Sequence, residues 1–237
     1  MAINISASLV KDYLRCSNQA RYRLEEPDKA TPTVYMTIGN IVHSAIEKHW
    51  DNKEKALKYP YNHSFNSAMI QRDLNSIEHY INTFFDHFVQ HLSKDDVIEK
   101  FFKLKLENGV YLVGKFDRIS DGILYDWKTS STVPSNINDD PQFIIYDYAF
   151  NRIYGTHPAS NFFASLSTGK LVPYSFDKLY FNELFNKVFP NLINDIRNGN
   201  YKRDGIFRKG TCFKCIYKND CLKRESNVMD DRNFAQK

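Results

Sequence analysis

The sequence lacks the features of a membrane or secreted protein. No apolar run reaches the roughly 20 residues that a transmembrane helix needs. The N-terminus has neither the basic start nor the long apolar segment of a signal peptide. A glycine-rich phosphate loop ending in Lys-Ser or Lys-Thr is also missing, which excludes an ATP-driven motor of that type within this chain. These absences predict a cytoplasmic protein of a bacterium, an archaeon or a virus inside its host cell.

Basic and acidic residues are nearly balanced in number. The 237 residues carry a formal net charge of only +4, which permits a nucleic-acid partner without requiring one. A hydrophobic content of 42% and an aromatic content of 15% predict a globular protein rather than a disordered one. We expect a single domain over residues 1–237, divided into a helical part (1–95), a sheet-and-helix core (96–198) and a cysteine-rich loop with a tail (199–237).

Cysteine is rare, and its distribution is uneven. Three of the four cysteines, Cys212, Cys215 and Cys221, lie within ten residues of one another, and the fourth, Cys16, lies near the N-terminus. In a reducing cytoplasm such thiols indicate metal ligands before disulfides. Four thiolates suit either a tetrahedral zinc ion or an iron–sulfur cluster. The alternative is a surface Cys-x-x-Cys without a metal, together with an unrelated buried Cys16.

The segment from residue 114 to residue 128 has the pattern of a β-hairpin. Residues 121–122 are Asp-Gly, a strong signal for a two-residue turn. Counting outward from this turn places Asp117 opposite Asp126, and Lys128 on the same face two residues further along. Opposed carboxylates about 5 Å apart repel each other unless a cation lies between them. The hairpin therefore predicts a metal-dependent hydrolytic centre with Lys128 as its charged helper.

This pattern has a simpler interpretation, because Asp-x-Lys is common on exposed strand faces. The apolar residues 111–113 and 123–125 beside the two acids favour buried strands instead, where charges need partners. Glu99 is a further candidate acid on the preceding strand. Ideal pairing around the Asn-Gly turn at residues 108–109, however, places Glu99 opposite Arg118, on the other face from Asp117. A bulge would be needed to bring Glu99 into the site, so we hold it as a candidate for a supporting role.

Periodicity and capping signals predict the remaining elements. We expect a helix from residue 140, with Asp140 as N-cap and Pro141 at the first position, in which Gln142 and Tyr146 share a face. His43 lies on a predicted helix, where a histidine more often packs in a core than binds a metal. The other predicted helices and strands span residues 6–24, 34–57, 64–92, 97–129 (three strands), 161–167, 170–176 and 177–198.

Taken together, these motifs resemble the RecB-like nucleases of the PD-(D/E)xK superfamily. The likeness is greatest to the iron–sulfur branch, which includes CRISPR-associated adaptation nucleases and AddB-type nuclease domains. It rests on residues 39–43 (Gly-Asn-Ile-Val-His), 114–117 (Gly-Lys-Phe-Asp), 126–128 (Asp-Trp-Lys) and 142–146 (Gln-x-x-x-Tyr), and on the split cysteine set. The proline that often precedes the first acid of this family is replaced by Phe116 here.

The resemblance implies an α/β (α+β) protein with a restriction-endonuclease-like core, which is a mixed central sheet flanked by helices. It also implies a metal-dependent deoxyribonuclease, most simply an exonuclease on single-stranded DNA with a structural 4Fe–4S cluster. The implied ligands of Mg²⁺ or Mn²⁺ are His43, Asp117, Asp126 and the main-chain carbonyl of Trp127. The implied catalytic residues are Lys128, Asp117, Asp126, Gln142 and Tyr146. The implied cluster ligands are Cys16, Cys212, Cys215 and Cys221.

Two other functions fit the same residues. The chain could serve as a non-catalytic DNA-binding or scaffolding subunit of a recombination or CRISPR-adaptation complex, or as a nuclease stabilised by zinc. Basic residues near the cysteines are candidates for contacts with DNA phosphates, although a solvated surface explains them equally well. These candidates are Arg15, Arg21, Arg23, Lys202, Arg203, Arg208 and Lys209.

Overall fold

The computed structural model describes residues 2–27, 33–62, 71–130, 137–202, 212 and 215–221. The chain divides into two compact units, which are described separately. The first unit comprises Met1–Ile5 and Pro32–Phe181, and the second comprises Ser6–Thr31 and Asn182–Lys237. The sheet and the hairpin with the two acids belong to the first unit, whereas all four cysteines belong to the second.

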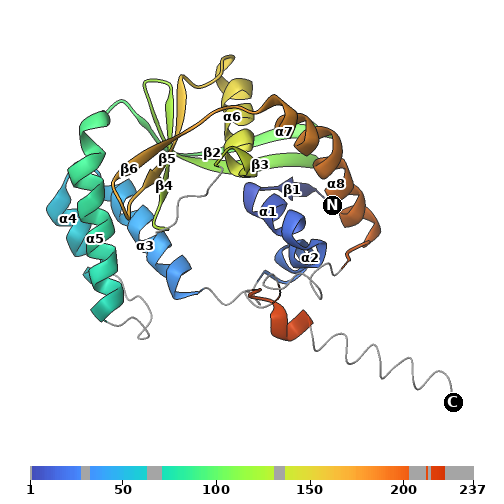
Figure 1. Cartoon of the computed structure of the whole chain (residues 1–237), viewed down its shortest axis with the longest axis horizontal. Helices are drawn as coiled ribbons and strands as arrows, with labels where there is room; N and C mark the ends of the chain where they lie inside the picture. The colour runs from blue at the N-terminus through green and yellow to red at the C-terminus, as the bar shows by residue number, and fades with distance from the viewer. Residues whose placement is uncertain are drawn as a thin grey trace. The chain divides into compact units, whose positions relative to one another are not determined.

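Among the described residues of the first unit, six strands form one mixed sheet (Figure 1). Their bounds are β1 Ile3–Ile5, β2 Val97–Glu107, β3 Val110–Ser120, β4 Ile123–Lys128, β5 Ser160–Ser165 and β6 Lys170–Tyr174. The pairs β1–β3 and β4–β5 are parallel, and the pairs β2–β3, β3–β4 and β5–β6 are antiparallel. The mixed sheet expected from the sequence is thereby confirmed, including the three-strand meander and its two tight turns.

Helices cover both faces of this sheet. Helices α3 (Val34–His49), α4 (Lys53–Lys58) and α5 (Gln71–His87) lie together on one side of strands β4 to β6, and α6 (Pro141–Tyr154) lies on the other side (Figure 1). The core between α3, α5 and the sheet includes the buried rings of Phe84, Phe88 and Trp127. The start of α6 is as predicted, since the Asp140 carboxylate accepts a hydrogen bond from the Gln142 amide and Pro141 occupies the first turn.

The described residues of the second unit include several helical segments. These are α1 (Ala7–Arg15), α2 (Ser17–Glu25), a π-helical turn (Leu184–Val188) and α8 (Phe189–Asn198). The short helix α7 (Lys178–Glu183) spans the boundary between the units. The predicted helix over 177–198 is therefore present as consecutive segments.

The first predicted helix is wrong in one respect, because the chain breaks it at Cys16. The backbone of Cys16 is extended, with φ −169° and ψ 118°, and separates α1 from α2. The main chain at Lys202 compensates, since its carbonyl accepts hydrogen bonds from the Asn18 amide and the Ser17 hydroxyl. A contact with a segment 185 residues away thus determines this helix boundary, and local sequence gives no signal for it.

The second predicted helix is also divided. It ends at His49, and Asn52 caps α4 by accepting a hydrogen bond from the Lys55 amide. The third predicted helix is present as α5, while its first residues lie outside the described ranges. Within the described part of the chain, no helix combines the length and apolar character needed to cross a membrane.

Candidate active site

The two acids of the hairpin lie where β3 and β4 stop pairing. The predicted turn register is confirmed, with Ser120 paired to Ile123. The ladder ends after two further pairs, so Asp117 and Asp126 lie just beyond it. The Asp117 carboxylate accepts a hydrogen bond of 2.9 Å from the Trp127 main-chain amide, across the gap between the strands. Both acids are buried, with exposed fractions of 8% and 2%.

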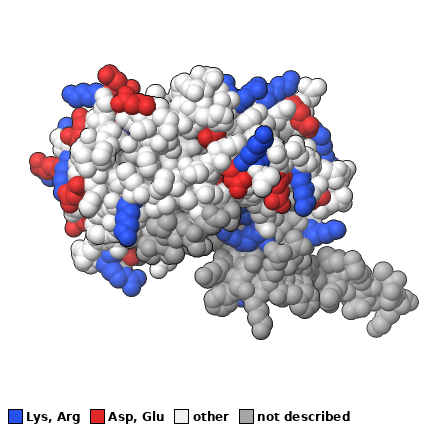
Figure 2. Space-filling view, turned by 45° about the horizontal axis from the view of Figure 1, so that its top comes forward, with Lys and Arg blue, Asp and Glu red and all other residues white. Residues whose placement is uncertain are grey.

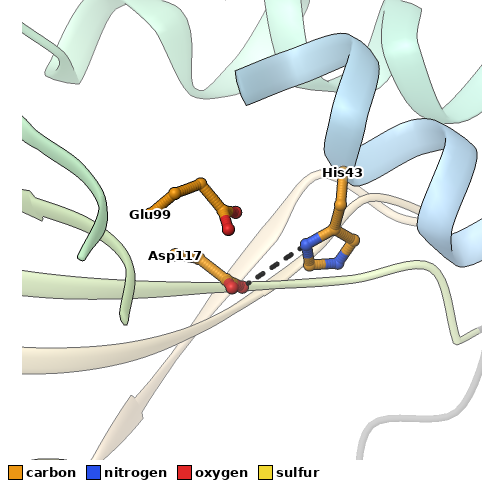
Figure 3. Close-up of side chains that lie close together, drawn as sticks. All are labelled: His43, Glu99 and Asp117. Carbon is orange, nitrogen blue, oxygen red and sulfur yellow. Dashed lines mark ion pairs between the residues drawn. The ribbon is translucent and has the colours of Figure 1, made fainter. Parts of the chain in front are cut away.

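Asp117 belongs to a compact set of three potential metal ligands. Ligand atoms of His43, Glu99 and Asp117 all lie within 4.8 Å of one another, and this is the one such group found among the described residues. Figure 3 shows the imidazole of His43 descending from α3 toward Asp117, with the carboxylate of Glu99 beside them. The His43 Nδ1 and Asp117 Oδ2 atoms are 3.7 Å apart.

The position of His43 follows from the packing of α3 against the end of β4. Gly39, one turn earlier on the helix, faces the Thr129 side chain, and a Cβ atom at Gly39 would lie 3.5 Å from the hydroxyl oxygen. Because residues four apart share a helix face, His43 also points toward the sheet. The ring is half-buried rather than enclosed in the core. This places His43 at the carboxylates, as the family resemblance implies, and not within the apolar stripe.

Glu99 enters the ligand set through a β-bulge, and the ideal register expected from the sequence is wrong. The pairing of β2 with β3 shifts by one residue between Lys105 and Glu107. Beyond this shift Ile98 pairs with Arg118, so Glu99 falls opposite Asp117 instead of opposite Arg118. The backbone of Glu99 has φ 51°, a left-handed conformation that is uncommon for a non-glycine residue. Such local strain often accompanies functional positions.

Asp126 has different partners from Asp117. The Lys128 ammonium lies 2.6 Å from Asp126 Oδ2, and the Gln142 side-chain amide donates a 2.7 Å hydrogen bond to Oδ1. The same amide donates to the Tyr146 hydroxyl at 3.1 Å, and that hydroxyl donates to the Lys115 carbonyl at 2.7 Å. One turn of α6 therefore fixes Asp126 and connects it to β3.

Burial and mutual repulsion determine how these groups titrate. Burial raises the pKa of Asp126 to about 6, although the nearby Lys128 ammonium partly opposes the rise. Burial lowers the pKa of Lys128, but the carboxylates of Asp126 and Asp117 outweigh this and raise it overall. Burial also raises the pKa of Tyr146 well above its usual value. At neutral pH the lysine is therefore charged and the phenol is protonated.

The structure brings His43, Asp117, Asp126, Lys128 and the pair Gln142–Tyr146 to one region of the first unit. Trp127 contributes in another way, because its indole is buried against Phe84 and its amide orients Asp117. The residue that sequence reasoning placed wrongly is Glu99. Only a bulge in the hairpin could have placed Glu99 beside Asp117. The sequence gives no signal for this bulge, because neither Lys105 nor Glu107 is a glycine.

The donor set fits a hard divalent cation. Two carboxylates and one imidazole are ligands that Mg²⁺ or Mn²⁺ accepts. The carboxylates of Glu99 and of the buried Asp117 lie close enough together to repel each other without a cation. Lys115 lies in contact with Glu99 as an ion pair and neutralises part of this charge. The side chains present are therefore consistent with a metal centre at the end of the hairpin.

Gly114 in the first strand motif has a packing role. Phe102 lies opposite it in the β2–β3 register, and its ring rests directly over the glycine, where a Cβ atom would overlap it. The ring is itself held by Phe116 and Tyr146, with centroid distances of 4.9 Å and 6.1 Å. The glycine thus allows α6 and β2 to approach β3 shortly before Asp117.

The four cysteines line a common pocket in the second unit. Its walls include Cys16, Cys212, Cys215 and Cys221, and its cavity volume is about 30 Å³. Among the described residues, however, no three of the four sulfurs lie within 4.8 Å of one another. The sulfurs therefore surround a shared space without forming a tight ligand set.

Polar and aromatic residues complete this pocket. The Asn18 side chain donates a hydrogen bond to the Cys221 sulfur at 3.2 Å. The buried rings of Tyr22 and Tyr217 stack at 5.2 Å beside the cysteines. Burial raises the pKa of the Cys215 thiol. The thiols are thus shielded from water on several sides.

Four of the seven basic residues suggested as DNA contacts are described, and three of these lie near acids. Arg23 forms an ion pair with the buried Asp12, and Arg15 lies 3.9 Å from the same carboxylate. Arg21 lies 3.8 Å from Glu25. The suggested residues at 203, 208 and 209 lie outside the described residues. On the face drawn in Figure 2, acidic and basic side chains are interspersed around a broad uncharged area instead of forming a field of one sign.

Comparison with protein families gives one match that covers most of the chain. Residues 4–222 match the model of the PD-(D/E)XK nuclease superfamily. A search of curated proteins finds no match. The six-stranded mixed sheet flanked by helices is consistent with the restriction-endonuclease-like fold of that superfamily. The chain therefore belongs to the PD-(D/E)XK nuclease superfamily.

Proposed function

We propose that this protein is a Mg²⁺- or Mn²⁺-dependent deoxyribonuclease that degrades single-stranded DNA as an exonuclease. The observation that carries the proposal is the convergence of His43, Glu99 and Asp117 near the buried Asp126 and its ion-pair partner Lys128. Superfamily membership supports a metal-dependent nuclease, and the buried carboxylates supply the hard oxygen ligands such a metal needs. Preference for single strands and for DNA ends rests on the resemblance to RecB-like nucleases.

The side chains would divide the work as follows. His43, Glu99, Asp117 and Asp126, together with the Trp127 carbonyl, would hold the cation, which when bound polarises the phosphate and acidifies a water molecule. Lys128 remains protonated at neutral pH, because nearby carboxylates raise its pKa. Its role is therefore to orient the attacking water and to stabilise negative charge on the phosphate in the transition state, rather than to accept a proton.

Gln142 and Tyr146 support this arrangement from α6. The Gln142 amide holds one oxygen of Asp126, which leaves the orientation of the carboxylate fixed relative to Lys128. Tyr146 stays a neutral phenol, since burial raises its pKa, and it fixes the Lys115 carbonyl. Both residues would position the acids of the hairpin. Gln142 would also contact the substrate.

For the cysteine pocket we propose a structural 4Fe–4S cluster. A single tetrahedral zinc holds its sulfurs about 3.8 Å apart, given a Zn–S bond of about 2.3 Å. No three of the described sulfurs all lie within 4.8 Å of one another, which favours a larger group in which each thiolate binds a different iron. The cluster would join the segment at Cys16 to the segment at residues 212–221 within the second unit. Partners in this proposal are DNA and a recombination or CRISPR-adaptation protein.

The first test is digestion of end-labelled and circular single-stranded DNA by anaerobically purified protein with Mg²⁺ or Mn²⁺. Wild type is compared with Lys128→Ala and with Lys53→Ala, whose side chain pairs with Asp86 on the surface. We expect metal-dependent loss of the linear substrate only, abolished by Lys128→Ala and unchanged in the control. Cleavage of circles would identify an endonuclease. An inactive but folded wild type that binds DNA would favour the scaffolding function and contradict the proposal.

A further inference from the structure

One face of the β2–β3 ribbon is exposed and continues from the candidate metal ligands. Along β2 the side chains that alternate with Glu99 on this face are Phe101, Lys103 and Lys105, all exposed. On β3 the residues directly opposite are Lys115, Val113 and Tyr111. Five of these residues, Phe101, Lys103, Lys105, Tyr111 and Lys115, are called the β2–β3 stripe below. The stripe adds three lysines and two aromatic rings to one side of the ligand set.

Phe101 is the most unusual member of the stripe. Its exposed fraction is 62%, whereas the next residue, Phe102, is 3% exposed and packs under α6 against Tyr146. Exposed single aromatics are common on protein surfaces and need no explanation by themselves. Phe101, however, lies directly opposite Lys115, and Lys115 is ion-paired with Glu99. The ring is therefore adjacent to the ligand set and flanked by a cation.

The rest of the stripe continues this alternation of rings and cations. Lys103 lies over the Tyr111 ring, with 4.4 Å between its ammonium and the ring centroid, and Lys105 is directly opposite Tyr111. Two residues of a strand span about 7 Å. Phe101 is thus one such step from Glu99, Lys103 two steps and Lys105 three. Cationic groups along this line match the charge of a phosphodiester backbone, and the rings match unpaired bases.

We propose that the β2–β3 stripe binds the single-stranded DNA that leads to the catalytic metal, with Phe101 as a base-stacking residue and Lys103 and Lys105 as phosphate contacts. This inference rests on the nuclease proposed above and deepens it by locating the substrate on a particular surface. Sequence-tolerant binding of single strands requires a charged path with aromatic rings on which bases stack. The stripe provides both on a rigid strand pair, and a duplex would not present its base faces to Phe101.

The test measures binding to the full-length protein by fluorescence anisotropy, without cleavage. The probe is a fluorescein-labelled 15-mer of thymidine in EDTA, titrated at several NaCl concentrations, together with an abasic 15-mer that keeps the phosphates only. Variants are Phe101→Ala and Phe101→Thr, the second of which keeps a strand-forming residue. The double variant Lys103→Ala/Lys105→Ala tests the phosphate contacts. Matched controls are Leu179→Ala, which is 81% exposed on α7, and Lys55→Ala/Lys58→Ala on α4.

The two kinds of variant have different expected signatures. Both Phe101 variants should weaken binding of the thymidine 15-mer about 5- to 100-fold, with no effect on the abasic probe or on the salt slope. The double lysine variant should reduce the slope of log K against log salt by about 1.4 with either probe, since each phosphate contact contributes about 0.7. Control variants should bind both probes as wild type does. Wild-type affinity and slope in the stripe variants would overturn the proposal.

Failure of this inference is separable from failure of the proposed function. Cleavage of the same thymidine 15-mer by wild type with Mn²⁺ is measured in parallel. Cleavage by wild type, with unchanged binding by the stripe variants, would refute the stripe and leave the nuclease intact. Binding that depends on the stripe, in a wild type that cleaves nothing, would refute the nuclease and leave the binding surface intact. If the wild-type protein does not bind the thymidine 15-mer at all, the proposal that the stripe binds DNA is wrong.

Discussion

Glu99 lies opposite Asp117 because β2 contains one residue more than ideal pairing requires between the turn and the site. The extra residue shifts the register between Lys105 and Glu107. Every earlier residue of β2 therefore pairs with the residue of β3 one position before the one that ideal pairing would give. Since side chains alternate between the two faces of a strand, a one-residue shift moves Glu99 from one face to the other. The bulge thereby brings a second carboxylate to the potential metal ligands His43 and Asp117.

Replacement of Glu99 by glutamine should weaken metal binding. Glu99→Gln keeps the size of the side chain and removes one negative charge from the ligand set, so we expect the Kd for Mn²⁺ to rise at least about tenfold, or about 1.4 kcal/mol. Cleavage at low Mn²⁺ should fall in parallel and recover partly at high Mn²⁺. Isothermal titration calorimetry gives the Kd. Glu107→Gln, on the same strand beyond the bulge, is the control, and equal affinities in the two variants would remove Glu99 from the ligand set.

Metal binding should also depend on pH around the pKa of Asp126. Burial raises this pKa to about 6, so the carboxylate is ionised above pH 6 and protonated below it. Because the folded-state pKa lies above the ordinary value of 3.8, ionised Asp126 destabilises the metal-free fold, and this cost disappears as the pH falls through 6 toward 4. A cation offsets the cost only when the carboxylate is charged. Mn²⁺ should therefore raise the Tm more at pH 7.5 than at pH 5.

The control for this pH dependence is Asp126→Asn, which cannot titrate. Its Mn²⁺-induced Tm shift should be smaller than that of wild type at pH 7.5 and should change less between pH 5 and pH 7.5. Thermal unfolding followed by circular dichroism at matched ionic strength measures both proteins. A wild-type Tm shift of the same size at the two pH values would show that Asp126 does not respond to the cation.

Gly114→Ala should destabilise the first unit, because the new methyl group overlaps the Phe102 ring. That ring is enclosed by Phe116 and Tyr146 and has little room to move. Overpacking of this kind costs about 1–3 kcal/mol. Gly39→Ala is the matched control, since its Cβ atom would make an ordinary 3.5 Å contact and alanine favours a helix. Urea denaturation should give a lower midpoint for Gly114→Ala alone, and partial recovery when Phe102→Leu is added.

Local signals in the sequence were sufficient for most elements around the site. The Asp-Gly turn fixed the hairpin register, and the Asp140-Pro141 start fixed α6, so the relation of Asp126 to Gln142 could be anticipated. These signals work because turn chemistry and capping act within a few residues. Glu99 could not be placed in the same way, since the bulge that moves it depends on packing along the whole of β2.

The helix break at Cys16 likewise depends on a long-range contact that local sequence does not reveal. The sequence around it has no proline or glycine, and the helix ends there because the Lys202 backbone accepts hydrogen bonds from Ser17 and Asn18. A contact between segments so far apart in the chain leaves no local pattern. The exposed Phe101 was also invisible in the sequence, because alternation alone does not tell which face of a strand pair is covered by a helix.

The cysteine pocket leads to a prediction about iron. Anaerobically purified wild type should be brown and contain about four iron atoms per chain, if each of the four thiolates binds one iron of the cluster. Cys16→Ser should lose most of this iron and lower the Tm, since Cys16 supplies the one ligand from the distant segment. Asn18→Ala should keep the iron but shift the reduction potential of the cluster, because Asn18 donates a hydrogen bond to the Cys221 sulfur.

Iron analysis, absorbance near 400 nm and a redox titration followed by electron paramagnetic resonance measure these effects, with wild type as the reference. Because the ligand set of His43, Glu99 and Asp117 lies wholly in the other unit, Mn²⁺ affinity should be retained in Cys16→Ser protein that remains folded. Zinc in place of iron in wild type would replace the cluster by a single-metal site. Full iron content in Cys16→Ser would mean that the cluster is held by residues 212–221 without the N-terminal segment.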